Sequence, residues 1–371
     1  MASRGSIQAS IRRLKRLQQT LRQHNLAAYL ATGRVEVSYL SNFGGDDSWL
    51  FVPARGRAVL LTDFRFAEDA AADSPHVVAR LRKGALVDDL ASLASRLRRP
   101  LGFNPDDVTV RERRLLGLKT RAGGLKPLPD AVRQMRLCKD AEEVAAIRRA
   151  LRVAEAAYGD FLQRLRLGMT ERDLAAELDY LMRRRGADAS GFPTICAIGP
   201  NTSRPHHRPG SRRLERGSAL LVDFGAMVDG YTCDLTRMVF LTRIAPRVRK
   251  AYQAVLDAQL AAIAAAGPGV KAVDVDGAAR QVLQRHRLAE AFGHGTGHGL
   301  GRQVHEAPTL SPRAGRCVLE PGMVVTVEPG VYLPGRFGIR IEDDVLITAT
   351  GAEVLSRLPK GAEEVTLDGI G

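Results

Sequence analysis

The sequence predicts two domains, a smaller α/β domain followed by a larger α+β domain. The chain has 371 residues, which is long for a single hydrophobic core. Helix and strand patterns alternate over the first third of the chain, whereas strand patterns dominate from residue 192 onward. Hydrophobic residues make up 45% and charged residues 26% of the chain, which is typical of a folded globular protein. We expect residues 1–133 to form the first domain and residues 134–371 the second.

Short strand and helix signals follow one another in the first domain. Apolar residues at helical spacing predict an amphipathic helix over 8–24, which is preferred to an organelle transit peptide. The runs WLFVP (49–53) and AVLLTD (58–63) are separated by Arg-Gly-Arg and predict a β-hairpin. Further strands are predicted at 27–32 and 100–104, and a further helix at 86–98. This alternation is typical of a small α/β domain.

The second domain is expected to begin with helices and continue with strands. Asp140 followed by Glu143 is typical of a helix N-cap and its N3 partner, and a second helix is predicted from Thr170. Strand patterns then occupy 192–199, 220–240 and 324–347, with helices at about 245–266 and 273–288. Helices on one side of antiparallel strands predict an α+β domain.

The net charge is +14, from 55 basic and 41 acidic residues. Arginine is spread along the chain without a dense tract, so an ordinary solvated surface is preferred to nucleic-acid binding. No apolar run approaches the roughly 20 residues that a membrane-spanning helix needs, and we expect no membrane partner. The four cysteines form no CxxC pair, which favours reduced thiols and a cytoplasmic location.

Two predicted hairpins bring four carboxylates together. An Asp-Gly pair between apolar runs of 220–240 is a strong hairpin signal, and it places Asp223 nearly opposite Asp234. A Pro-Gly turn relates Glu328 to Glu342 in the same way. Carboxylates at the ends of buried strands repel one another unless a cation lies between them. The pattern therefore predicts a pseudo-symmetric site for a pair of divalent cations.

Histidines fall in two places that suit this site. The glycine-rich segment HGTGHGLGRQVHE supplies His294, His298 and His305. Its glycines exclude a regular helix, so the first two histidines do not form the helical HExxH zinc pattern. An imidazole among carboxylates suits manganese, cobalt or zinc better than calcium, and further imidazoles could stabilise an oxyanion or move protons. His206 and His207 lie in a loop before the first hairpin, and spacing alone does not distinguish them.

Several segments resemble a known family. VDFGAMVDGYTCDLTR, GHGTGHGLGRQVHE, TVEPGVYLPG and GIRIEDD are similar, in order and nearly in spacing, to the metal segments of the pita-bread metallopeptidases. SYLSNFGG (38–45) and AVLLTDFRF (58–66) resemble the N-terminal domain of the Xaa-Pro aminopeptidase and prolidase branch. The resemblance implies a pita-bread catalytic domain preceded by a creatinase-type α/β domain. Methionine aminopeptidases share the former and usually lack the latter.

The resemblance also implies roles for individual residues. The metal ligands would be Asp223, Asp234, His298, Glu328 and Glu342. They would hold two divalent ions, manganese being favoured over cobalt and zinc. Glu328 would also act as the general base. The groups that contact substrate or stabilise the intermediate would be His206, His294 and His305, with Arg340 supporting the carboxylates or the substrate. His207 is expected to be an exposed bystander.

The activity that the resemblance implies is hydrolysis of the Xaa-Pro bond at the N-terminus of proline-containing peptides, as in an Xaa-Pro aminopeptidase. The alternative is an Xaa-Pro dipeptidase. Methionine removal is less favoured because of the N-terminal domain. Metal-free creatinase-like chemistry and a non-catalytic peptide- or nucleic-acid-binding member of the fold are less favoured because all five ligand positions are filled. A homodimer is expected.

Overall fold

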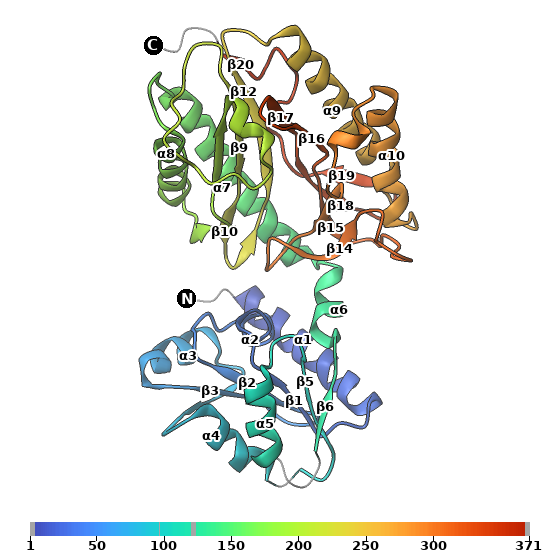
Figure 1. The fold of residues 1–371 in the computed structure, drawn as a ribbon. Coiled ribbons are helices and arrows are strands. Elements are labelled where there is room, and N and C mark those ends of the chain that lie inside the picture. The colour runs from blue at the N-terminus through green and yellow to red at the C-terminus, as the bar shows by residue number, and fades with distance from the viewer. Residues whose placement is uncertain (1–3, 96, 120–123, 368–371) are drawn as a thin grey trace. The chain divides into compact units, whose positions relative to one another are not determined.

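The computed structural model describes residues 4–95, 97–119 and 124–367. The chain divides into two compact units, Met1–Arg136 (unit 1) and Leu137–Gly371 (unit 2) (Figure 1). Within the described part of the chain, no helix is both long and apolar enough to cross a membrane.

Unit 1 is built on a six-stranded mixed sheet in the order β4-β3-β2-β1-β5-β6. The strands are β1 (Ala28–Ala31), β2 (Trp49–Pro53), β3 (Val59–Thr62), β4 (Val78–Leu81), β5 (Leu101–Phe103) and β6 (Leu125–Pro127). The helices are α1 (Arg4–Gln23), α2 (Arg34–Ser41), α3 (Ala67–Asp73), α4 (Leu86–Ala94), α5 (Val110–Lys119) and α6 (Ala131–Leu137). The predicted β2–β3 hairpin is confirmed by their antiparallel pairing. Two apolar clusters, one with α1 and α2 and the other with α4 and α5, pack against the strands.

Four long helices flank the strands of unit 2. They are α7 (Ala141–Arg164), α8 (Glu171–Arg184), α9 (Pro246–Ala265) and α10 (Ala272–Arg285). Figure 1 shows α7 and α8 on one side of the strands and α9 and α10 on the other. Both predicted helix starts are confirmed, because Asp140 and Thr170 each form a reciprocal capping box with the residue three positions later.

The strands of unit 2 form several small sheets. A first group comprises β7 (Ala189–Ser190), β8 (Ile195–Ile198), β9 (Ala219–Phe224), β10 (Ala226–Val228), β11 (Tyr231–Thr232), β12 (Leu235–Leu241) and β20 (Thr366–Leu367). A second group comprises β13 (Gly297–Gly299), β14 (Glu306–Leu310), β15 (Val324–Val327), β16 (Gly330–Leu333), β17 (Phe337–Arg340), β18 (Asp343–Ile347) and β19 (Ala352–Val354). The main sheets have the orders β20-β12-β9-β8 and β14-β13-β15-β18-β19.

The first predicted hairpin is confirmed, and its turn residues Asp229 and Gly230 both have positive φ, at 53° and 72°. The β9–β12 ladder pairs Asp223 with Thr236, so Asp234 lies just beyond the end of that ladder. Between β9 and β10, Gly225 is required by close approach, because a Cβ there would lie 2.0 Å from the carbonyl oxygen of Cys233.

The second hairpin has the same design. Strands β16 and β17 pair antiparallel from Leu333–Phe337 at the turn to Gly330–Arg340 at the base. The β15–β18 ladder then begins at Val327 and Asp343. Glu328 and Glu342 therefore lie opposite one another in the gap between two ladders, where the chain passes from one sheet to the next. Both hairpins thus present their carboxylates at strand junctions.

Unit 1 contains a buried carboxyl group on α2. Glu36 is 5% exposed and accepts hydrogen bonds from Tyr29 Oη at 2.9 Å and Asn104 Nδ2 at 3.1 Å. Burial, and next the negative charge of Asp107, raise the pKa of Glu36 to about 7. Folded unit 1 therefore holds this proton at a pH where the unfolded chain has lost it.

The raised pKa predicts that unit 1 loses stability as pH rises from about 4.5 to about 7. At ~1.4 kcal/mol per pKa unit, the loss is about 3 kcal/mol. Glu36→Gln should remove this loss. Denaturant unfolding can be followed by the fluorescence of Trp49, the single tryptophan, which lies in β2. Glu68→Gln, at an exposed position, is the matched control. Parallel pH profiles for Glu36→Gln and wild type would contradict the assignment.

Candidate metal centre

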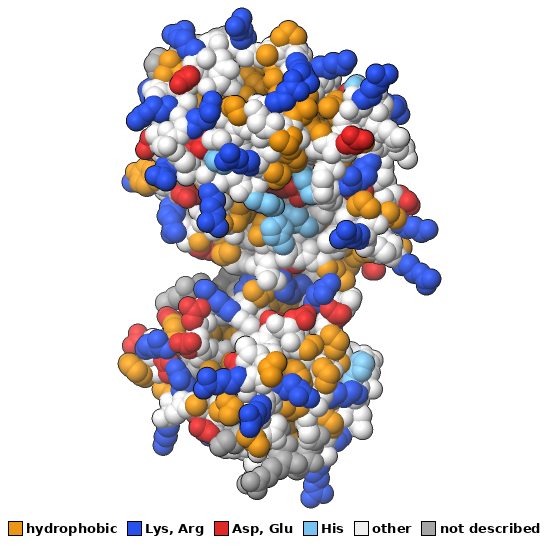
Figure 2. Space-filling model, in the orientation of Figure 1, with side chains coloured by type: hydrophobic (Ala, Val, Ile, Leu, Met, Phe, Trp, Pro, Cys, Tyr) orange, Lys and Arg blue, Asp and Glu red, His pale blue; other side chains and the backbone are white. Residues whose placement is uncertain are grey.

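One cavity of about 550 Å³ in unit 2 gathers the candidate residues from both hairpins and the glycine-rich segment. The structure brings all nine of them to its lining, namely His206, Asp223, Asp234, His294, His298, His305, Glu328, Arg340 and Glu342. Figure 2 shows histidine side chains gathered in a hollow on this face of unit 2, with acidic side chains beside them. Segments more than a hundred residues apart in sequence therefore share one site.

Three of the five candidate ligands form a compact group. Ligand atoms of Asp234, His298 and Glu342 all lie within 4.8 Å of one another. His298 Nε2 is 3.7 Å from Asp234 Oδ2 and 3.3 Å from Glu328 Oε1, which adds a fourth member. The fifth, Asp223, directs Oδ2 to the guanidinium Nη2 of Arg340.

The carboxylates of this group repel one another strongly because Asp223, Asp234 and Glu342 are buried. Burial, and next the charge of Glu342, raise the pKa of Asp234 well above its usual value. Burial and the charge of Glu328 do the same to the pKa of Glu342. Burial also raises the pKa of Asp223, and the Arg340 charge offsets only part of this effect. Protons or cations must therefore accompany these groups.

Glu328 and His298 interact as a pair within this field. Burial alone would raise the pKa of Glu328, but the hydrogen bond and charge of His298 outweigh it and lower that pKa. Burial would conversely lower the pKa of His298, but the hydrogen bond and charge of Glu328, together with Gly299 and Asp223, outweigh burial and raise it. Of the carboxyl groups in the cluster, Glu328 is thus the one most readily kept ionised.

The donor set fits divalent cations of the manganese, cobalt or zinc type. Glu342 is 2% exposed, and its Oε1 has no hydrogen-bond partner among the described residues. A buried carboxylate oxygen without a partner is costly unless something positive reaches it. Four carboxylates and one imidazole match the ligand preferences of borderline and hard divalent ions.

A chain of hydrogen bonds fixes His294. Arg340 Nη1 donates to the Tyr332 hydroxyl at 2.8 Å, and that hydroxyl lies 3.0 Å from His294 Nε2. Because the Gly295 carbonyl can only accept, the His294 Nδ1–H donates to it at 2.8 Å, and in a neutral ring Nε2 then accepts from the Tyr332 hydroxyl. Burial lowers the pKa of His294, so the neutral ring that this pattern requires is favoured.

Helix α10 supports the same loop from behind. Arg280 donates to the carbonyl of His294 at 2.5 Å, and Asp276 accepts from both the backbone N–H and the hydroxyl of Thr296. Arg280 and Asp276 are themselves an ion pair one helical turn apart, with 2.7 Å between Nε and Oδ2. The glycine-rich backbone is thereby held although it has no helix of its own.

The expectation that His207 is exposed is wrong. His206 is exposed at the cavity, but His207, expected to be an exposed bystander, is only 8% exposed. Its Nε2 lies 2.8 Å from Glu171 Oε2. The expectation was wrong because a residue thirty-six positions earlier, at the start of α8, provides a buried partner that spacing within the loop does not reveal.

Glu171 is the anchor of this loop. Its side chain is fully buried and accepts hydrogen bonds from the Ile198 N–H (2.8 Å), Asn201 Nδ2 (2.8 Å) and the Gly210 N–H (2.9 Å), in addition to His207. Burial would raise the pKa of Glu171, but these hydrogen bonds outweigh it and lower that pKa. The carboxylate therefore ties both ends of the 198–210 segment to α8.

Sequence reasoning missed Tyr332 and Glu171 as members of the site. Tyr332 lies in the first strand of the second hairpin, within GVYLPG, where a phenol two positions from the strand start could have been noticed. Glu171 follows the Thr170 cap and was read only as part of a helix start. No local signal indicates its burial, because all four of its partners lie on other segments.

Comparison with known proteins agrees with this architecture. Residues 145–349 match the family described as metallopeptidase family M24, and residues 13–138 match the creatinase/prolidase N-terminal domain. A structure of an Xaa-Pro dipeptidase from Bacillus anthracis has a TM-score of 0.91 at 32% identity, covering 96% of this chain and all of that one. An X-Pro aminopeptidase structure from Thermotoga maritima has a TM-score of 0.88 at 33% identity, covering 94% of this chain and 98% of that one.

Fold and cavity together define a metallopeptidase with the pita-bread fold, preceded by a creatinase-type domain. The chain belongs to metallopeptidase family M24. An Xaa-Pro dipeptidase of Pyrococcus furiosus is 36% identical over 239 residues, which cover 64% of this chain and 68% of that protein. The predicted family and fold class are confirmed. Membership implies a hydrolase that uses divalent metal ions.

The two neighbouring histidines should separate stability from activity. His206 lines the cavity, so His206→Ala should lower peptidase kcat/KM. Because the side chain is exposed, the same change should leave the free energy of unfolding unaltered. His207→Ala leaves a buried carboxylate short of a partner, which should cost about 1–3 kcal/mol of stability. Urea unfolding and peptide hydrolysis would be measured on both variants. An unchanged unfolding curve for His207→Ala would show that the Glu171 contact is dispensable.

Proposed function

We propose that this chain is a dinuclear-metal peptidase that hydrolyses the bond preceding proline, with Xaa-Pro dipeptides as its preferred substrates. The observation that carries the proposal is that five candidate ligands and four candidate substrate groups line one cavity. Relatives named as Xaa-Pro dipeptidases support the dipeptide preference, although sequence analysis placed the aminopeptidase first.

Two divalent ions would be held by Asp223, Asp234, His298, Glu328 and Glu342. When bound, such ions supply Lewis-acid chemistry, which lowers the pKa of water and polarises a carbonyl group. The ions would also neutralise the mutual repulsion of the buried carboxylates, which otherwise favours their protonated forms. Manganese is proposed ahead of cobalt and zinc because oxygen donors outnumber nitrogen donors by four to one in this set.

Glu328 would act as the general base. Its lowered pKa keeps it ionised near neutral pH, so it can accept a proton from the attacking water and pass it to the leaving proline nitrogen. The exposed His305 has its ring 4.4 Å from that of His298 and would stabilise the developing oxyanion. His206 and His294 would hold the substrate from either side, and Arg340 would keep Asp223 and Tyr332 in place.

Selection for proline follows from its covalent structure. A bond preceding proline is a tertiary amide, which lacks an N–H and has a constrained φ. A cavity that offers a flat apolar wall can therefore accept the ring without leaving a buried donor unpaired. The side chains of Phe192, Pro193 and Ile195 supply apolar lining next to the carboxylates.

Arg208 supports dipeptides as the preferred length. It lines the cavity two residues after His206 and is exposed. Within the described part of the chain, Arg208 forms no ion pair with an acidic side chain. A guanidinium that is not already paired can receive the carboxylate that ends a dipeptide. A longer peptide presents an amide at that point instead.

An Xaa-Pro aminopeptidase is the second candidate. The Thermotoga maritima structure carries that name at an identity similar to that of the dipeptidase structures. In addition, the cavity is large enough to admit more than two residues. Both activities cleave the same bond with the same groups, so the length of the accepted peptide is what distinguishes them.

Kinetics on matched peptides test the proposal. After removal of metal with a chelator and addition of manganese, cobalt or zinc, kcat/KM should be higher for Xaa-Pro than for Xaa-Pro-Yaa. Arg208→Gln should lower kcat/KM for the dipeptide roughly 10-fold to 100-fold, about 1.4–3 kcal/mol, while changing that for the tripeptide little. Equal losses on both peptides would refute the carboxylate contact, and a tripeptide preference in wild type would favour the aminopeptidase.

Glu328→Gln should reduce kcat by roughly 100-fold to 10,000-fold, the range typical of a lost general base. The amide keeps the shape of the side chain but cannot accept the proton. Turnover would be measured together with metal content by elemental analysis and with the dissociation constant of a bound peptide. Near-native turnover at full metal occupancy would exclude Glu328 as the base.

A further inference from the structure

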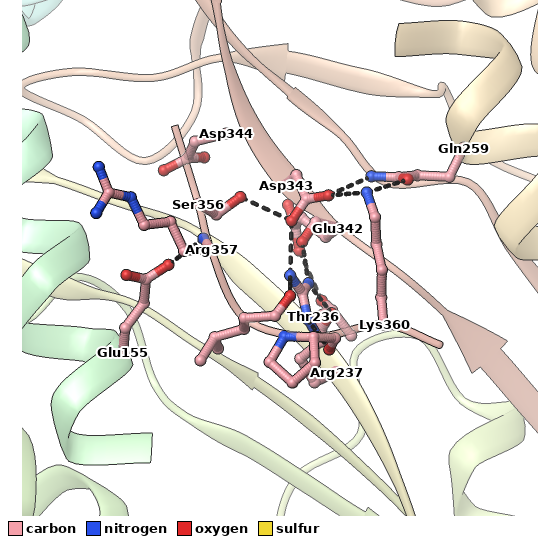
Figure 3. A network of polar contacts seen from close by, with 12 residues as sticks. Glu155, Thr236, Arg237, Gln259, Glu342, Asp343, Asp344, Ser356, Arg357 and Lys360 are labelled. Atoms are coloured by element: carbon pink, nitrogen blue, oxygen red, sulfur yellow. Dashed lines mark hydrogen bonds and ion pairs between the residues drawn. The ribbon is translucent and has the colours of Figure 1, made fainter. Parts of the chain in front are cut away.

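Adjacent residues on β12, Thr236 and Arg237, both contact Glu342 but from opposite faces of the strand. Thr236 is fully buried and lies on the same face of the ladder as Asp223, its cross-strand partner. Arg237 faces the other way and is 1% exposed. Figure 3 shows both side chains close to Glu342 and Asp343. Two neighbouring residues of one strand therefore hold Glu342, one at its backbone and the other at its carboxylate.

The backbone of Glu342 is fixed by Arg237. Arg237 Nη1 donates to the Glu342 carbonyl at 2.5 Å and to the Thr236 carbonyl at 3.0 Å, while the Glu342 N–H donates to that same Thr236 carbonyl at 3.2 Å. The remaining donors of the guanidinium reach Asp343 Oδ1 and the carbonyls of Leu358 and Pro359. Arg237 thus joins β12, the Glu342 segment and the C-terminal region.

Asp343 holds the Arg237 guanidinium in place. Its carboxylate accepts four hydrogen bonds within 2.8 Å, two of them from cations (Figure 3). The donors are Arg237 Nη2, Ser356 Oγ, Lys360 Nζ and Gln259 Nε2. Burial would raise the pKa of Asp343, but the charges of Arg237 and Lys360 outweigh it and hold that pKa well below its ordinary range. A satisfied buried network of this kind permits little movement of the neighbouring backbone.

The carboxylate of Glu342 is oriented by Thr236. The fully buried hydroxyl accepts from Arg340 Nε at 3.0 Å and lies 2.6 Å from Glu342 Oε2. Arginine has no acceptor, so the single hydroxyl proton is left for Oε2. Oε1 of the same carboxylate has no partner among the described residues.

We propose that Thr236 is a positioning residue that occupies one oxygen of Glu342 and reserves the other, Oε1, for a metal ion. The proposal rests on Glu342 being a metal ligand, as in the proposed function. It assigns no chemistry to Thr236 itself. The Arg340–Thr236–Glu342 chain restricts rotation of the carboxylate, so the oxygen that a cation needs is already aimed at it before binding. Groups that orient a ligand in this way typically contribute 10-fold to 100-fold in metal affinity.

Manganese titration of the chelator-treated full chain, followed by calorimetry, tests the proposal without any substrate. Thr236→Val keeps the volume but removes the hydroxyl, and should weaken Mn²⁺ binding about 10-fold to 100-fold. Thr236→Ser restores the hydroxyl and should remain within about 3-fold of wild type, which a purely steric role for the threonine would not predict. If the valine variant does not fold, Thr236→Ala replaces it.

Ser356→Ala is the matched control, because it removes a hydroxyl that donates to the neighbouring carboxylate of Asp343. It should lower the melting temperature of the metal-free protein and weaken Mn²⁺ binding far less than Thr236→Val does, because three other donors still hold Asp343. If Thr236→Val bound Mn²⁺ as tightly as wild type while Glu342→Gln lost the metal, the positioning role of Thr236 would be wrong and Glu342 would remain a ligand. Wild-type affinity in Glu342→Gln as well would instead remove Glu342 from the proposed metal site.

Discussion

Repulsion among buried carboxylates is the constraint on which unit 2 depends. Asp223, Asp234, Glu328 and Glu342 converge where water is scarce, and burial raises the pKa of three of them. Such a cluster is stable only with counter-charge. Arg340 supplies part of it at Asp223, and His298 supplies part at Glu328. What remains unneutralised, around Asp234 and Glu342, is the part of the site for which a divalent ion is needed.

The fold meets this constraint by ending strands where charge is required. Both hairpins change sheets near their carboxylates, so Asp234, Glu328 and Glu342 lie outside the regular ladders while Asp223 lies next to the end of one, and the four side chains can converge. Close backbone approach at Gly225 makes the first of these junctions possible. Two further cations, Arg237 and Lys360, do not line the cavity but surround Asp343, where they add rigidity without pairing with the candidate ligands.

Local signals in the sequence were sufficient for much of this arrangement. Hairpin turns, helix caps and the order of apolar strands are encoded within a few residues, and the structure confirms the Asp229 turn and the Asp140 cap. Contacts between distant segments were not accessible in the same way. His207 has its buried partner in Glu171, which lies 36 positions earlier on another element. Neither spacing nor composition records such pairings.

The contrast between His206 and His207 shows why residue type alone is a weak guide to function. Both imidazoles line the same cavity and follow one another in the chain, yet one is exposed and the other is held by a buried carboxylate. Glu171 fixes the loop through four hydrogen bonds, and His207 contributes one of them. The same reasoning applies to Thr236 and Arg237, whose side chains leave one strand in opposite directions and both reach Glu342. Groups that do no chemistry thus decide where the reactive groups stand, because a displacement of about 1 Å at a reacting group can cost 100-fold in rate.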